Sequence, residues 1–168
     1  GPMNYVKEYY KSISGKKGIA CEEVKSIYQR LVREMNRPPK GFQYYFSEEQ
    51  GEYVINFIEG YCKHYQGEHA GEYVRLELFQ KAFIQALFGW LEKGTNRRRF
   101  REYFFEVPRK HGKSFLSGCI AVYMMTADGE AGAEIYSAAT KLDQAKIIYN
   151  VAKNTTRSEE RFSRNAET

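Results

Sequence analysis

The sequence predicts an α/β protein with a parallel sheet, preceded by a helical region. Apolar residues recur at helical spacing through the first half of the chain. After a basic loop, short aromatic and β-branched runs alternate with helical stretches, an order that favours a parallel sheet. Gly1 and Pro2 read as the remnant of a tag before Met3. We therefore expect a helical region over residues 3–70 and an α/β domain over residues 71–168.

The first predicted helix spans residues 19–35 and carries one apolar stripe. It stops before Pro38 and Pro39, because two consecutive prolines cannot continue a helix. A second helix begins at Ser47, which with Gln50 three residues later matches a capping box.

We expect this second helix to end near Gly67. Residues 66–71 (QGEHAG) are polar, contain two glycines and lack periodicity, so they mark the boundary between the two regions. A third apolar stripe runs from residue 78 to residue 90 and is closed by Lys93 and Gly94, as is typical of helix ends.

Strands are predicted only after this third helix. Residues 103–107 (YFFEV) form a short aromatic run typical of a buried strand, and residues 115–125 return to helical character. A second strand is predicted at 133–137. A further helix follows at 142–152, with Thr140 as its N-cap.

Composition and charge exclude several classes of protein. The chain is 42% hydrophobic, which argues against disorder, and no apolar run reaches the roughly 20 residues needed to cross a bilayer. The net charge is +5, yet the window from Lys93 to Ser114 holds eight basic and two acidic residues. This concentration indicates an anionic ligand at one place.

The cysteines indicate a reducing compartment. Cys21, Cys62 and Cys119 are odd in number and widely spaced, so we expect reduced thiols in a cytoplasm. Cys62 lies near His64 and His69, but these three residues lack the paired spacings of a zinc site.

The chemistry is carried by residues 107–114 (VPRKHGKS), a variant of the Walker A loop G-x-x-x-x-G-K-[ST] in which Val107 replaces the first glycine. Gly112 lets the backbone N–H groups approach a phosphate closely. Lys113 would contact the β- and γ-phosphates of ATP, and the Ser114 hydroxyl would bind Mg²⁺.

The rest of this loop adds charge that the common pattern does not require. The alternative is a solvated loop with a serine near a helix start, but the flanking strand and helix and the dense positive charge favour phosphate binding. The expected ATP-binding residues are Arg109, Lys110, His111, Gly112, Lys113 and Ser114.

The loop and its surroundings resemble the large terminase subunits of tailed bacteriophages. These proteins commonly carry V-x-R-K-x-G-K-S, which residues 107–114 match. Residues 76–80 (LELFQ) are similar to the family's L-x-P-W-Q element, with Leu78 for the proline and Phe79 for the tryptophan. Residues 137–145 look like its helicase-like motif. The resemblance extends over nearly the whole chain.

The resemblance implies roles for residues that the sequence alone leaves open. Gln80 would contact adenine, or else be a polar residue on the exposed face of its helix. Thr140 and Gln144 would couple nucleotide state to DNA, or else be an N-cap and a solvated helix position. The basic residues after the third helix would touch DNA phosphates or form a solvated turn: Arg97, Arg98 and Arg99.

The resemblance also implies a P-loop fold and a motor. The full protein would hydrolyse ATP in a ring of subunits and move double-stranded DNA into a procapsid, in the cytoplasm of the host. It would work with a portal protein and a small terminase subunit, away from any membrane, and would cleave DNA with a carboxy-terminal nuclease.

The sequence lacks the apolar run ending in Asp-Glu that such an ATPase needs to hold Mg²⁺ and orient water. We therefore expect a truncated ATPase domain that binds nucleotide without hydrolysing it. Two alternatives remain open: a helicase-like P-loop ATPase, and a non-catalytic helical interaction module, residues 3–70, on a degenerate P-loop fold.

Overall fold

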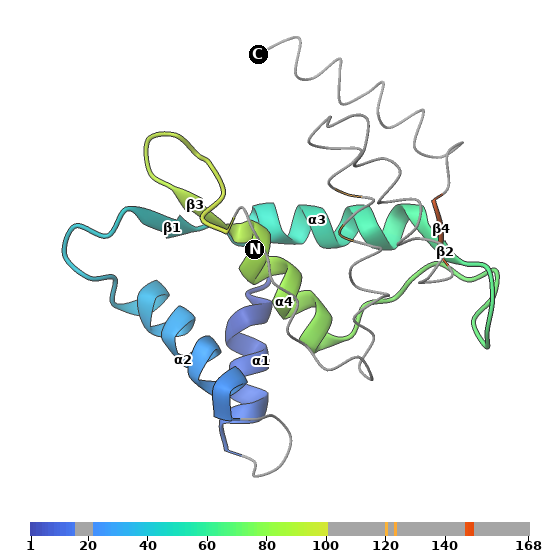
Figure 1. The fold of residues 1–168 in the computed structure, drawn as a ribbon, viewed down its shortest axis with the longest axis horizontal. Helices are drawn as coiled ribbons and strands as arrows, with labels where there is room; N and C mark the ends of the chain where they lie inside the picture. The colour runs from blue at the N-terminus through green and yellow to red at the C-terminus, as the bar shows by residue number, and fades with distance from the viewer. Residues whose placement is uncertain (16–21, 101–119, 121–122, 124–146, 150–168) are drawn as a thin grey trace. The chain divides into compact units, whose positions relative to one another are not determined.

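The computed structural model describes residues 1–15, 22–100, 120, 123 and 147–149 (Figure 1). The chain divides into two compact units. The first unit comprises Gly1–Asn56 and Leu76–Phe105, and the second comprises Phe57–Arg75 and Glu106–Thr168. The sequence-based division between residues 70 and 71 stays a prediction.

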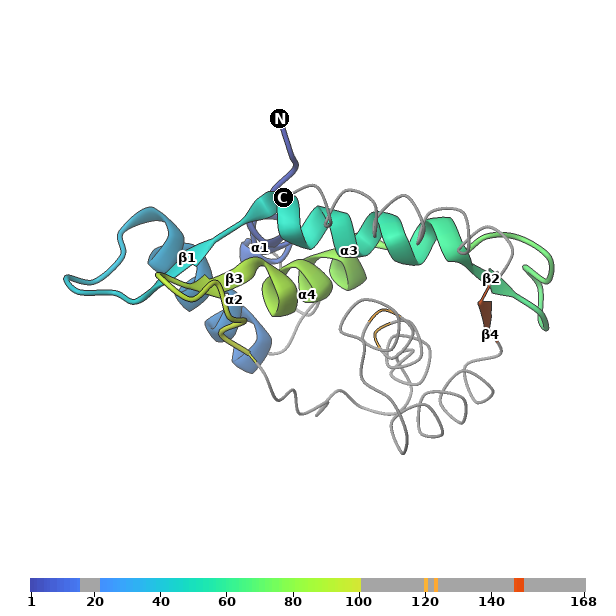
Figure 2. The same cartoon turned by 90° about the horizontal axis from the view of Figure 1, so that it is seen from above.

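The first unit is built from helices and one two-stranded sheet. Helix α1 packs against α2 and α4 (Figures 1 and 2). Strands β1 and β3 pair antiparallel. Its elements are α1 (Tyr5–Ser14), α2 (Glu22–Asn36), β1 (Tyr44–Phe46), the first part of α3 (Glu48–Tyr61), α4 (Leu78–Gly89) and β3 (Trp90–Glu92).

Helix α1 was not predicted. It begins after Asn4, whose side-chain oxygen accepts a hydrogen bond from the backbone N–H of Lys7 at 2.9 Å, an N-cap that the sequence offers. Val6 and Ile13 lie seven residues apart on one face and are fully buried. Two such apolar positions are a weak periodic signal among many tyrosines and charges.

Helix α2 confirms the first predicted helix over its described residues and ends at Asn36, before the two prolines. Tyr28 and Leu31 are buried, and the ring of Tyr28 meets that of Tyr9 edge-on at 5.1 Å. Burial, and secondarily Tyr9, raises the pKa of Tyr28, so its phenol stays neutral in the core. Ile27, on the predicted apolar stripe, is instead exposed.

Helix α3 confirms the predicted cap at Ser47. The Ser47 hydroxyl accepts from the backbone N–H of Gln50 at 3.2 Å, while the Ser47 N–H donates to the Gly89 carbonyl at 2.7 Å. The end near Gly67 was wrong: the helix stops at Tyr61. The next three residues pair as a strand, so tertiary pairing outweighs helical continuation.

Helix α4 confirms the third predicted helix but ends at Gly89, before the expected closing residues Lys93 and Gly94. Trp90 belongs to β3, because residues 90–92 pair with β1 in the register Phe46↔Trp90 and Tyr44↔Glu92. Trp90 is 1% exposed and forms the centre of the core, with the ring of Phe46 at 5.2 Å and that of Phe42 at 6.0 Å.

A buried glutamine joins three helices of this unit. The Gln85 side-chain oxygen accepts from the backbone N–H groups of Tyr5 and Val6 at 2.7 and 3.3 Å. Its amide nitrogen donates to the carbonyls of Met3 and Glu48 at 2.8 and 3.2 Å. All these groups are therefore satisfied although Gln85 is completely buried, and α4 is tied to the beginnings of α1 and α3.

The second unit contains a strand that the sequence misassigned. Strand β2 (Cys62–His64) pairs antiparallel with β4 (Ile147–Tyr149) in the register Cys62↔Tyr149. The helix predicted over 142–152 is therefore wrong at residues 147–149. Two isoleucines and a tyrosine fit a pleated strand as well as a helix, and the partner strand decides.

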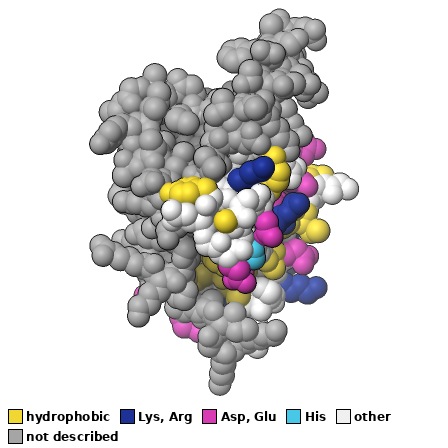
Figure 3. All heavy atoms as spheres, turned by 90° about the vertical axis from the view of Figure 1, so that its right-hand side faces the viewer, with side chains coloured by type: hydrophobic (Ala, Val, Ile, Leu, Met, Phe, Trp, Pro, Cys, Tyr) yellow, Lys and Arg dark blue, Asp and Glu magenta, His cyan; other side chains and the backbone are white. Residues whose placement is uncertain are grey.

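Residues 66–71 form the turn of a hairpin within the second unit. The N–H of Val74 donates to the Cys62 carbonyl at 2.8 Å, and that of Gly71 donates to the His64 carbonyl at 2.7 Å. The described side chains visible in Figure 3 include acidic, basic and hydrophobic ones close together.

The predicted helix over residues 115–125 is confirmed at Ile120 and Tyr123, which are helical and buried. The ring of Tyr123 packs edge-on against Phe57 at 5.6 Å. The strands predicted at 103–107 and 133–137 lie outside the described residues, so the parallel sheet stays a prediction. Among the described residues, no helix is long and apolar enough to span a bilayer.

Candidate functional site

Gln80, the candidate adenine contact, lies in the first turn of α4 and is 9% exposed. The alternative that placed it on an exposed helix face is therefore wrong. Its side-chain oxygen accepts from the backbone N–H of Glu77 at 2.8 Å, which caps the helix. The oxygen thus accepts one hydrogen bond, and the amide nitrogen has two hydrogens to donate.

The two residues before Gln80 are large, apolar and partly exposed. Leu78 is 38% exposed and Phe79, which stands where the resemblance has tryptophan, is 37% exposed. The ammonium group of Lys81 lies 5.3 Å from the centre of the Tyr5 ring, a cation–π contact that fixes the side chain after Gln80. The start of α4 therefore combines a polar contact with accessible apolar surface.

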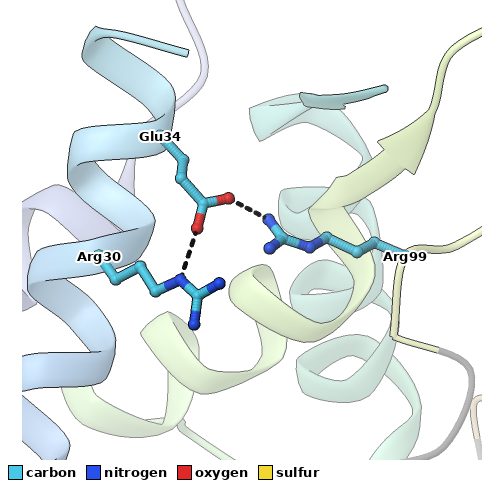
Figure 4. A network of polar contacts seen from close by, with 3 residues as sticks. All are labelled: Arg30, Glu34 and Arg99. Atoms are coloured by element: carbon cyan, nitrogen blue, oxygen red, sulfur yellow. Dashed lines mark hydrogen bonds and ion pairs between the residues drawn. The ribbon is translucent and has the colours of Figure 1, made fainter. Parts of the chain in front are cut away.

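Arg99, a candidate DNA contact, points into the protein (Figure 4). One guanidinium nitrogen lies 2.6 Å from a carboxylate oxygen of Glu34 on α2. The other carboxylate oxygen accepts from Arg30 at 3.2 Å. The side chains of Arg99 and Glu34 are only 14% and 8% exposed, so this pair is largely shielded from water.

Aromatic rings surround the same guanidinium. Its central carbon lies between 4.9 and 5.4 Å from four ring centres, within the range of cation–π attraction. The solvated-turn alternative is therefore wrong for Arg99, whose environment is that of a structural residue. The four rings belong to Phe42, Tyr44, Trp90 and Phe100.

Arg97 and Arg98 have different environments. The Arg98 guanidinium lies 5.3 Å from the centre of the Phe88 ring, and Arg98 is half-buried. Arg97 is exposed and follows a tight turn in which its carbonyl accepts from the N–H of Glu92 at 2.7 Å. Of the three consecutive arginines, Arg97 is therefore exposed to solvent, whereas Arg98 and Arg99 pack against the protein.

The histidines near Cys62 form a small polar cluster on the hairpin. His69 lies 3.0 Å from the Glu72 carboxylate, and the rings of His64 and His69 are 6.0 Å apart. Burial, and then the neighbouring His69, lowers the pKa of His64, while Glu72 opposes the shift. Within the described part of the chain, no group of three His, Cys, Asp or Glu residues is placed to hold a metal ion.

Comparison with known proteins identifies the family. Residues 78–166 match the family described as "Terminase large subunit, ATPase domain". The chain belongs to this family. It is also 32% identical over 104 residues to "Terminase, large subunit" of Enterobacteria phage HK97, which covers 61% of this chain and 19% of that protein. The chain thus spans about a fifth of the length of that relative. No solved structure matches the chain.

The matched segment contains every candidate that the sequence singled out, from Gln80 to Gln144. The Walker A variant of this terminase segment and its two coupling candidates lie outside the described residues, so their arrangement stays a prediction. These residues are Arg109, Lys110, His111, Gly112, Lys113, Ser114, Thr140 and Gln144.

Sequence reasoning missed Glu34 and Gln85. Glu34 lies three residues after Leu31 on the buried face of α2, and a carboxylate at such a position signals a buried cationic partner. Gln85 has no comparable signal, since it lies outside the apolar stripe chosen for its helix. The observation that α4 is apolar on nearly every side would have predicted its burial.

Proposed function

We propose that this chain holds the ATP and Mg²⁺ of a terminase large subunit. The observation that carries the proposal is the sequence of residues 107–114, a Walker A variant, inside the segment that matches the terminase ATPase family. A strand that leads into a basic glycine-containing loop and then a helix is the arrangement in which backbone N–H groups and a helix N-terminus bind phosphate.

Each residue of the loop has a distinct task in this proposal. Gly112 permits close approach of the backbone to the phosphates, Lys113 neutralises the β- and γ-phosphates, and Ser114 binds Mg²⁺. Arg109, Lys110 and His111 form the rest of the loop, and the two cations among the three strengthen its positive field.

Gln80 would contact adenine through its amide group, whose nitrogen has two hydrogens to donate and whose oxygen, which accepts from the Glu77 N–H, keeps a second lone pair. An amide that is buried and held by a capping contact loses little further freedom when a base arrives, which favours selectivity. Thr140 and Gln144 would transmit the nucleotide state toward DNA. Support for these roles comes from the positions of all three residues within the matched segment.

The complete protein would use ATP hydrolysis to move double-stranded DNA into a procapsid. Family membership and the likeness to a phage terminase large subunit support this role. A motor that accepts any sequence grips phosphates and not base edges, because the backbone is the same everywhere. In this proposal the motor is a ring of subunits that works with a portal protein and a small subunit, and a carboxy-terminal nuclease cleaves the DNA.

Thermal unfolding with nucleotide tests the ATP site. A non-hydrolysable ATP analogue with Mg²⁺, at about ten times its Kd, stabilises a folded protein by about 1.4 kcal/mol, or roughly 3–6 °C in Tm. We expect this shift in the chain and in Lys40→Ala, which removes an exposed positive charge elsewhere. Lys113→Ala should abolish it. The absence of any shift in the unmodified chain at millimolar nucleotide would contradict the proposal.

A further inference from the structure

Arg97 and Arg99 differ in their exposure to solvent. Arg99 is held by Glu34 and by aromatic rings, as Figure 4 shows for the carboxylate, and cannot reach a ligand without breaking a buried ion pair. Arg97 is exposed. An anion that binds this part of the first unit can therefore contact Arg97 but not Arg99. The residues around Arg97 then determine which kind of anion can bind.

Two loops lie at the same end of the β1–β3 sheet. Residues 37–43 lead into β1 and residues 93–97 follow β3, and because the strands are antiparallel these two connections share one end. The backbone N–H of Lys93 donates to the carbonyl of Gln43 at 2.7 Å, which joins the loops directly. We refer to the exposed cations of these two loops as the basic tip.

The basic tip contains positive charge alone. The two loops read RPPKGFQ and KGTNR, without an aspartate or glutamate. The nearest carboxylate along the chain, that of Glu92, accepts from the Thr95 hydroxyl at 3.0 Å. The four cations are all exposed: Arg37, Lys40, Lys93 and Arg97.

Both loops are fixed turns. The first contains a turn in which the N–H of Phe42 donates to the Pro39 carbonyl at 3.0 Å, and Gly41 has a φ of 76°, a conformation that favours glycine. In the second, Asn96 has a φ of 58° and its side-chain oxygen accepts from the Tyr45 hydroxyl at 2.7 Å. The cations thus extend from a backbone that is already ordered.

We propose that the basic tip contacts the phosphate backbone of double-stranded DNA. The inference rests on the proposed function, which supplies DNA as the polyanion. Four exposed cations on two loops that contain no acidic residue attract a polyanion such as the phosphate backbone. The polar side chains between Lys93 and Arg97, those of Thr95 and Asn96, are engaged with Glu92 and Tyr45.

Salt-dependent binding of the 168-residue chain to a labelled duplex of about 30 base pairs tests the tip, because removing one phosphate contact lowers the salt slope by about 0.9. We expect Lys40→Gln/Lys93→Gln/Arg97→Gln to reduce the slope of log K against log salt by about 2.7 and to weaken binding about tenfold or more at low salt. The charge-matched control, Lys7→Gln/Lys11→Gln/Arg75→Gln, removes three exposed cations outside the tip and should bind like the unmodified chain.

Equal binding by the tip variant and the unmodified chain would overturn the inference, as would equal weakening in the tip variant and its control. No duplex binding by the unmodified chain at low salt would do the same. The nucleotide-induced shift in Tm separates this failure from that of the proposed function. If the shift persists and still requires Lys113, the ATP site stands and the basic tip alone is wrong.

Discussion

The first and second units each contain a close contact between a basic and an acidic side chain, and the two contacts have opposite surroundings. In the first unit, Arg99 and Glu34 lie 2.6 Å apart, with side chains 14% and 8% exposed. On the hairpin of the second unit, His69 and Glu72 lie 3.0 Å apart, with side chains 63% and 68% exposed. Distance hardly distinguishes these pairs, whereas exposure separates them completely.

This difference in exposure indicates which charged side chains stabilise the fold and which can be replaced at little cost in stability. A buried carboxylate without its partner, or a buried arginine left alone, bears the cost of desolvation without compensation. An exposed pair exchanges its partner for water at almost no cost. Four aromatic rings around Arg99 increase the difference between the two pairs, because their cation–π contacts with the guanidinium add to the stability of the buried pair.

The largest effect is expected for Glu34→Ala. It leaves Arg99 buried beside aromatic rings without its carboxylate, and we expect a loss of about 3–5 kcal/mol in the free energy of unfolding. Arg30→Ala removes the other arginine of the same network, whose side chain is 73% exposed, and should cost less than about 1 kcal/mol. Urea unfolding of both variants measures the difference. Similar losses would show that burial does not govern this network.

A smaller loss is expected for Gly51→Ala in α3. A Cβ at this position would lie 2.3 Å from the Gln85 Cγ, so the two helices must move apart or Gln85 must give up its hydrogen bonds. Overpacking of this kind costs about 1–3 kcal/mol. Gly15→Ala, where a Cβ meets nothing within 4 Å, is the matched control and should be close to neutral in urea unfolding. A neutral Gly51→Ala would contradict the close packing of α3 on α4.

A still smaller effect is expected for His69→Ala on the hairpin. The variant removes an exposed pair with Glu72, which contributes about 0–1 kcal/mol. Its urea midpoint should therefore stay close to that of the unmodified chain. A loss in the free energy of unfolding as large as that of Glu34→Ala would show that this contact stabilises the fold although both side chains are exposed.

The smallest effect is a dependence of stability on pH at His64. Burial and His69 lower the pKa of His64 in the folded protein, while Glu72 raises it less. Stability is therefore complete above the unfolded pKa of about 6.5 and falls as pH decreases toward the lowered folded value, because the unfolded chain binds the proton first. His64→Gln should flatten this slope in unfolding experiments between about pH 7 and 5. An unchanged slope would assign the dependence to other groups.

The same contrast explains how much of the fold could be predicted. Periodicity and local signals gave α2, the start of α3 and most of α4, because these depend on neighbours a few residues away. The strands β2 and β4 each have three residues and exist through pairing between Cys62 and Tyr149, far apart in sequence. A local sequence pattern gives no information on a partner strand so distant in sequence, and for this reason the pattern of residues 147–149 predicts a helix.

The candidate site divides in a similar way. A phosphate-binding motif at residues 107–114 can be proposed from sequence, because phosphate binding requires particular residue types at fixed spacing. The environment of Arg99 could not be found, since it depends on Glu34, 65 positions earlier. A run of three arginines looks uniform in sequence, and only tertiary contacts separate Arg97 from Arg99.

Equilibrium titration of the chain with a fluorescent ATP analogue in the presence of Mg²⁺ tests most directly the proposal that Gly112, Lys113 and Ser114 form the site for ATP and Mg²⁺, with Lys113 on the phosphates. Lys113→Ala removes a charged contact to the phosphates and should raise the Kd about tenfold or more. Lys40→Ala, which changes the net charge equally, should leave the Kd unchanged. Equal Kd values for the unmodified chain and Lys113→Ala would contradict the account.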